Sequence, residues 1–130
     1  MNYWHIQANR NAAIDRGVAV SHPEFPNWVF YVRPDHGWNY HFSRAAARIA
    51  VSRPEIVELF SRLSQPGYIP TPDDQALRYD VELQGFAEGN IAHWENVTDE
   101  HGEEIDFTPA RAANVFAHFR QLYEFLRDFA

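Results

Sequence analysis

A chain of 130 residues, 45% hydrophobic and 15% aromatic, is long enough to bury the core of one domain. It contains no cysteine, which excludes disulfide bonds and thiolate metal sites. The net charge is −7, and the window from Asp73 to Asp106, with eleven acids and one arginine, carries −10, which leaves +3 elsewhere and disfavours binding to nucleic acid.

The first 24 residues show no clean apolar period, and we expect an N-terminal arm or a short helix there. The opening sequence MNYWHIQANRNAAIDRG has no charged segment leading into an apolar run, so no secretory signal is predicted. No apolar run in the chain approaches the roughly 20 residues of a membrane-spanning helix. We therefore expect a soluble protein with no membrane partner.

The stretch WVFYV-RPDHG-WNYHF, residues 28–42, predicts a β-hairpin. Its first five residues form a short apolar run of β-prone type, and its last five alternate aromatic with polar residues. The intervening RPDHG contains Pro34 and Gly37, which favour a turn.

Two helical stretches follow, at 43–64 and 71–88. Pro54 interrupts the first, and the spacing of Ser52 and Glu55 is that of a capping box, so a second helix is predicted to restart there. In the second, Thr71 precedes a proline at the first helical position, and acidic residues follow near the positive end of the helix dipole. The stretch ends at the helix breaker Gly89.

Residues 94–107 read WENVTDEHGEEIDF and predict a hydrophilic turn between two short strands, with apolar Val97 and Ile105 on either side. Thr108 and Pro109 then favour the start of a helix that runs to the end of the chain. Its broad apolar face needs cover from the core or from another chain. The predicted fold is α+β, a mainly α-helical single domain over 1–130 with one or two short β-hairpins and a helical body at 43–130.

The uneven charge suits self-association, with the acidic window of one copy against an arginine face of another. The alternative, that both surfaces are simply solvated, stays open. Binding to nucleic acid would instead need a local patch of four arginines in the helical stretch at 43–64: Arg44, Arg48, Arg53 and Arg62.

Catalytic motifs are missing from the sequence. The histidines have no zinc-ligand spacing, the acids around Gly102 fail the register of an EF-hand loop, and there is no nucleophile elbow or phosphate-binding loop. We therefore expect no catalytic residues, no metal and no cofactor. A calcium site of another type at the acidic turn stays possible, since hard cations need only converging oxygens.

The segment from Trp94 to Pro109 resembles one that is common in small tail proteins of long-tailed phages and prophages, notably the tail assembly chaperones of siphophages. The shared pattern is W-x-x-V-x-D-E-x-G-x-x-(V/I)-x-F-T-P, and this chain matches it throughout. In that group the segment also follows a helix and precedes a C-terminal helix. The resemblance covers residues 75–130 well and the WVFYVRP region loosely, while the first 27 residues have no counterpart.

The resemblance implies a non-catalytic protein that binds the tape measure protein, keeps it soluble and helps to recruit tail tube subunits. Such a protein acts in the host bacterial cytoplasm during assembly, is absent from the mature virion and is expected to self-associate. An apolar helix face of the chain would cover the apolar stripes of the tape measure protein. The candidate partner-binding residues are Trp94, Val97, Phe116, Phe119, Tyr123 and Phe125, although each of them could instead fill the core.

Two other functions stay open. One is a different small phage tail protein, such as a completion or connector subunit, which would share the size and the acidity. The other is a small metal-dependent enzyme built on His36, His41, His93 and the acids.

Overall fold

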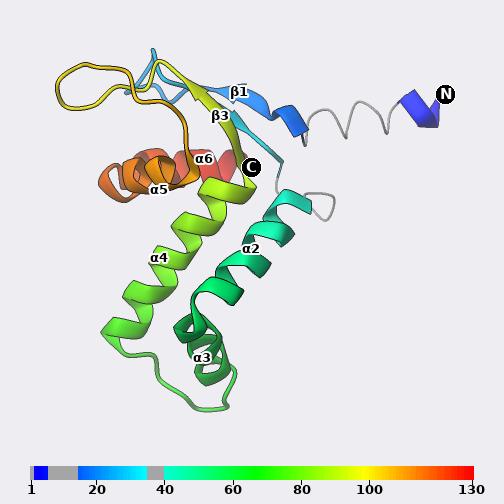
Figure 1. Ribbon diagram of the computed structural model, residues 1–130, viewed down its shortest axis with the longest axis vertical. Coiled ribbons are helices and arrows are strands. Elements are labelled where there is room, and N and C mark those ends of the chain that lie inside the picture. Colours follow the sequence, from blue (N-terminus) through cyan, green and yellow to red (C-terminus); the bar gives the residue numbers. More distant parts are fainter. Residues whose placement is uncertain (1, 6–14, 35–39) are drawn as a thin grey trace.

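The computed structural model describes residues 2–5, 15–34 and 40–130. Within these ranges the chain is mostly helical with one three-stranded antiparallel sheet, which confirms the predicted α+β class (Figure 1). Its elements are β1 (Val18–Val20), β2 (Val29–Val32), α2 (Tyr40–Ser52), α3 (Pro54–Leu63), α4 (Pro72–Gly89), β3 (Ile91–Glu95), α5 (Pro109–His118) and α6 (Arg120–Phe129).

The sheet is built around β2, which pairs antiparallel with β1 on one side and with β3 on the other. The prediction of a hairpin over 28–42 is therefore correct for its first strand and wrong for its second. Residues 35–39 lie outside the described ranges, and the chain from Tyr40 onward already belongs to α2. The alanine-rich run extends a helix at little cost once its first turn has formed. Both edges of β2 are occupied by β1 and β3, so no edge of β2 is left for a hairpin partner.

The segment expected as an arm or a short helix contributes β1, an edge strand. The chain enters β1 through Gly17, whose φ is +77°. A Cβ at this position would lie 2.7 Å from the carbonyl carbon of Tyr31, so β1 approaches β2 more closely than a side chain would permit. Sequence periodicity missed a strand of three residues because it is too short to show an alternating pattern.

The break between α2 and α3 occurs where it was predicted, at Pro54, but the capping box does not form. The hydroxyl of Ser52 donates to the carbonyl of Ile49 at 3.1 Å, which is a bond within α2. Arg53 is the N-cap of α3 and makes no side-chain cap; its Nε instead donates to Glu55 at 2.9 Å. The restart of the helix therefore rests on the proline at its first position.

Helix α4 starts where its sequence predicts, with Pro72 in its first turn, and the structure adds a capping box there. The Thr71 hydroxyl accepts from the amide of Asp74 at 3.1 Å, and the Asp74 carboxylate accepts from the amide of Thr71 at 3.2 Å. Asp74 also accepts from the Tyr68 hydroxyl and, at 2.8 Å, from Arg62. These donors, Tyr68 foremost, lower the pKa of Asp74 to about 2, which keeps this buried carboxylate ionised.

The C-terminal helix is two helices and not one, which corrects the prediction of a single helix from 109. Phe119 ends α5 and precedes α6 with φ −116° and ψ 80°, outside the helical region. Its ring packs edge-on against Phe25 and Trp28, at centroid distances of 5.1 and 5.7 Å. Contacts with a segment about 90 residues earlier in the chain thus accompany the break, and helical spacing could not reveal them.

The acidic stretch at 94–107 forms the predicted turn element. Thr98 and Glu104 form an isolated antiparallel bridge, and the amide of Ile105 donates to the carbonyl of Val97 at 2.8 Å. The element links β3 to α5, whose N-cap is Thr108 as predicted.

The main core lies between the sheet, the second half of α4 and the helices α5 and α6. The pair α2 and α3 packs on α4 and extends away from the sheet (Figure 1). Among the α2 and α3 side chains that the structure describes, four apolar ones are buried: Ala45, Ile49, Ile56 and Leu59.

Candidate interaction surface

Four of the six candidate contact residues are core residues in the structure. Trp94, Val97, Phe116 and Tyr123 are between 0 and 3% exposed, and the Trp94 indole donates to the carbonyl of Ile105 at 2.7 Å. A partner cannot reach Trp94, Val97 or Phe116 in the folded chain, whereas the largely buried Tyr123 lines an apolar groove. All four hold the acidic turn, α5 and α6 against the sheet and α4.

The other two candidates, Phe119 and Phe125, lie nearer the surface. Phe119 is half-buried in the aromatic cluster that ties residues 22–28 to the α5–α6 junction. Phe125 is 37% exposed, and its ring packs edge-on against His22 at 4.7 Å. The structure therefore does not bring the six predicted residues together on one surface.

An apolar groove lies elsewhere, between α3 and α6 on one face of α4. It has a volume of about 500 Å³ and is lined by residues of α2, α3, α4 and α6. Val57 and Phe60 on α3 lie at its border with exposed fractions of 54 and 47%. The charged groups lining it are Glu82 and Arg127, and the Arg127 guanidinium lies over the Tyr123 ring, 5.2 Å from its centroid.

Sequence reasoning missed this groove, although a signal was present. The apolar residues of α3 include Ile56, Val57, Leu59 and Phe60, which is a wider face than one neighbouring helix can cover. Ile56 and Leu59 are buried, and the two others remain exposed. Only the packing of α3 on α4 shows which half of the face stays open.

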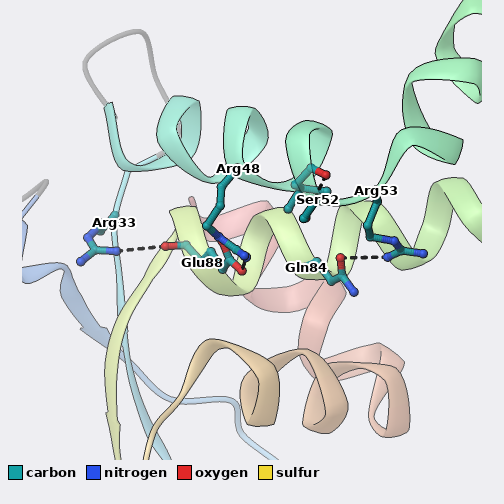
Figure 2. A network of polar contacts seen from close by, with 7 residues as sticks. Arg33, Arg48, Ser52, Arg53, Gln84 and Glu88 are labelled. Carbon is teal, nitrogen blue, oxygen red and sulfur yellow. Dashed lines mark hydrogen bonds and ion pairs between the residues drawn. The ribbon is translucent and has the colours of Figure 1, made fainter.

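A polar network joins α2 to the opposite face of α4 (Figure 2). Arg48 pairs with Glu88, its Nε donating to Oε2 at 3.1 Å, and Arg53 donates to Gln84 at 3.0 Å and to Asp80 at 2.8 Å. These side chains border a second groove of about 440 Å³ between α2 and α5, whose α5 wall is built largely from alanines. The network links α2 and the junction between α2 and α3 to α4.

The acidic turn is exposed throughout residues 99–104. Asp99 orders it from within, since its carboxylate accepts from the amides of His101 at 2.8 Å and Glu103 at 3.0 Å. Gly102 has a φ of +79°, which allows the tight reversal. In residues 2–5, 15–34 and 40–130, no arginine forms an ion pair with an acid of this turn.

The histidines invoked for a metal site are spread over the fold. His41 bonds Asp15 at 3.1 Å, His93 lies beside Tyr31 and Phe107, and His36 falls outside the described residues. Among the residues that the structure describes, no group of three or more histidines and acids is placed to hold a metal ion.

Comparisons with known proteins returned no matching family, no matching curated protein and no matching solved structure. None of the helices in the described part of the chain combines the length and the apolar character needed to cross a membrane.

Proposed function

We propose that this chain is a non-catalytic tail assembly chaperone of a siphophage-type phage or prophage, which binds the tape measure protein in the apolar groove beside α3. The partner is inferred from the resemblance of the Trp94–Pro109 segment. The observation that carries the binding role is the groove itself, bordered by the exposed side chains of Val57 and Phe60.

The chemistry of the groove suits an amphipathic helix. Four helices line it with mostly apolar side chains, and one acid and one arginine flank it. Helix-in-groove recognition uses apolar anchors spaced along one helix face, and a long helical tape measure protein offers such faces repeatedly. Covering them during assembly in the host cytoplasm would prevent aggregation, and the tail tube protein would be recruited to the resulting complex.

Co-expression with the tape measure protein of the same phage or prophage tests the proposal. The wild-type chain should keep that protein soluble and co-elute with it. The double variant Val57→Gln/Phe60→Gln should lose the complex, because it removes the apolar anchors while glutamine preserves helix propensity.

A matched control is the double variant Val51→Gln/Ile69→Gln, which changes two exposed apolar residues that do not line the groove. It should bind as the wild type does. Failure of the wild type to bind the tape measure protein would overturn the proposed function. Equal binding by the groove variant would move the contact to another surface.

Mass spectrometry of purified virions separates this proposal from its nearest rival. A chaperone should be missing from the finished particle. A stoichiometric amount of the chain in the virion would favour a structural tail component, such as a completion or connector subunit.

A further inference from the structure

We propose that the apolar groove beside α3 recognises a helix whose apolar face carries one uncharged hydrogen-bond donor, which pairs with the carboxamide oxygen of Asn90. This inference rests on the proposed function and deepens it. Apolar anchors recur along the whole of a long helical protein, so they cannot by themselves distinguish one of its segments from another. A buried polar contact would supply that distinction.

Asn90 is a buried polar residue at the end of the groove nearest the sheet. It is 1% exposed, lines the groove and lies between the last turn of α4 and the start of β3. Its Nδ2 donates to the carbonyl of Arg33 at 3.3 Å. Because a carbonyl oxygen can only accept, this bond fixes which end of the carboxamide carries the nitrogen. In the parts of the chain that the structure describes, Oδ1 of Asn90 accepts no hydrogen bond.

The charged groups of the groove already have partners. Oε1 of Glu82 lies 3.5 Å from Nε of Arg78, and the Arg127 guanidinium lies over the Tyr123 ring. Since Nδ2 of Asn90 is held by the end of β2, its Oδ1 is the polar atom left to face the groove. An acceptor that is buried without a hydrogen bond is costly, so covering the groove favours an occupant that brings a donor to this atom.

The dimensions of the groove suit a helix that lies along α4. On α4 and its C-cap the lining runs from Val81 to Asn90, which spans about 14 Å at 1.5 Å per residue. Anchors at positions i, i+4 and i+7 of a bound helix span about 10 Å. Gly85 and the two α2 alanines of the lining, Ala46 and Ala50, leave room for such side chains. A helix that fills the groove therefore places a residue of its apolar face beside Asn90.

An uncharged donor suits this place better than a cation. Nη1 of Arg33 donates to the carbonyls of Glu88 and Ile91, at 3.4 and 3.3 Å, so a guanidinium already lies close to Asn90. A lysine or arginine of the occupant would meet this like charge while losing its own hydration. Serine, threonine, asparagine and glutamine supply a donor without a charge. A single polar residue in an apolar stripe fixes the register of paired helices, so the groove would fix where along the tape measure protein this chain binds.

Peptides of about 20 residues that tile the tape measure protein of the same phage or prophage test the proposal against the full chain. Isothermal titration calorimetry should show that the binding peptides carry one serine, threonine, asparagine or glutamine within an apolar stripe. Replacing this donor by an apolar residue of similar size, such as valine for threonine or leucine for asparagine, should weaken binding roughly tenfold. The same replacement on the opposite face of the peptide is the control and should leave the affinity unchanged.

A cycle of variants on both partners gives the decisive result. Asn90→Ala should bind the donor-bearing peptide roughly tenfold more weakly than the wild type does. It should bind the donor-free peptide at least as tightly as the wild type does, because the hydrogen bond is already missing there. Asn114→Ala removes an exposed asparagine of α5 outside the groove and should match the wild type with both peptides. Circular dichroism shows whether each variant is folded, and the peptide replacements decide by themselves if Asn90→Ala is not.

The inference and the proposed function fail in different ways. Binding peptides that have no uncharged donor in the apolar stripe would overturn the inference alone, as would an equal effect of Asn90→Ala on both peptides. If no peptide of the tape measure protein binds, the proposed function is wrong and the inference falls with it.

Discussion

At the scale of single residues, Asp74 links the start of α4 to the loop before it. Its carboxylate accepts hydrogen bonds from Tyr68, Arg62 and the amide of Thr71, and its pKa falls from 3.8 to about 2. Because the folded pKa lies below the unfolded one, this carboxylate stabilises the fold above a pH of about 4. The contribution is lost as the pH falls from there toward 2.

The variant Asp74→Asn should therefore be less stable at neutral pH and should lose part of the acid-induced destabilisation between about pH 4 and pH 2. Urea unfolding at several pH values measures both effects. Asp73→Asn is the matched control, since it removes the exposed carboxylate next to Asp74. An Asp74→Asn variant with the full wild-type slope in that pH window would contradict the assignment.

Gly17 is the residue that permits the close approach of β1 to β2. Gly17→Ala combines an unfavourable positive φ with a Cβ placed 2.7 Å from the Tyr31 backbone, and we expect a loss of about 1 to 3 kcal/mol in the free energy of unfolding. Gly67→Ala is a control with the same φ of +77° but no atom within 4 Å of the added Cβ. Chemical denaturation should show a smaller loss for Gly67→Ala, and equal losses would mean that β1 simply moves aside.

At the scale of elements, the junction between α5 and α6 depends on Phe119. Phe119→Ala should remove the ring that Phe25 and Trp28 pack against and lower the free energy of unfolding by about 2 to 3 kcal/mol, less than for a fully buried ring. The near-ultraviolet circular dichroism of the aromatic cluster should weaken as well. Phe129→Ala, at a half-exposed ring of α6, is the control and should cost less. Equal losses would show that the cluster does not support the junction.

The helices could be predicted from local signals to very different degrees. Local signals, a proline at the first position and acids in the first turn, predicted the start of α4, and the structure adds the capping box of Thr71 and Asp74. Ser52 and Glu55 have the same spacing, yet Ser52 bonds within α2 and Glu55 is held by Arg53. Whether this spacing produces a capping box therefore depends on which other hydrogen-bond partners the tertiary fold supplies.

At the scale of the whole molecule, stability should be unequal between the two ends of α4. The sheet, α5, α6 and the second half of α4 share the main core, whereas α3 contributes only Ile56 and Leu59 as buried side chains. Amides of α3 should consequently exchange hydrogen faster than those of the second half of α4, because less apolar surface opposes their local opening. Hydrogen exchange followed by mass spectrometry measures the difference. Uniform protection across the molecule would mean that α3 opens only with global unfolding.

By itself, the sequence determined the α+β class, the limits of α4, the turn at 94–107 and the uneven charge, because each rests on neighbouring residues. Only the tertiary structure decided that β2 pairs with β1 and β3, that Phe119 divides the last helix and that Trp94, Val97, Phe116 and Tyr123 are buried. It also decided that Val57 and Phe60 stay exposed. An apolar side chain favours burial wherever cover exists, and which ones find cover depends on contacts between residues far apart in the chain.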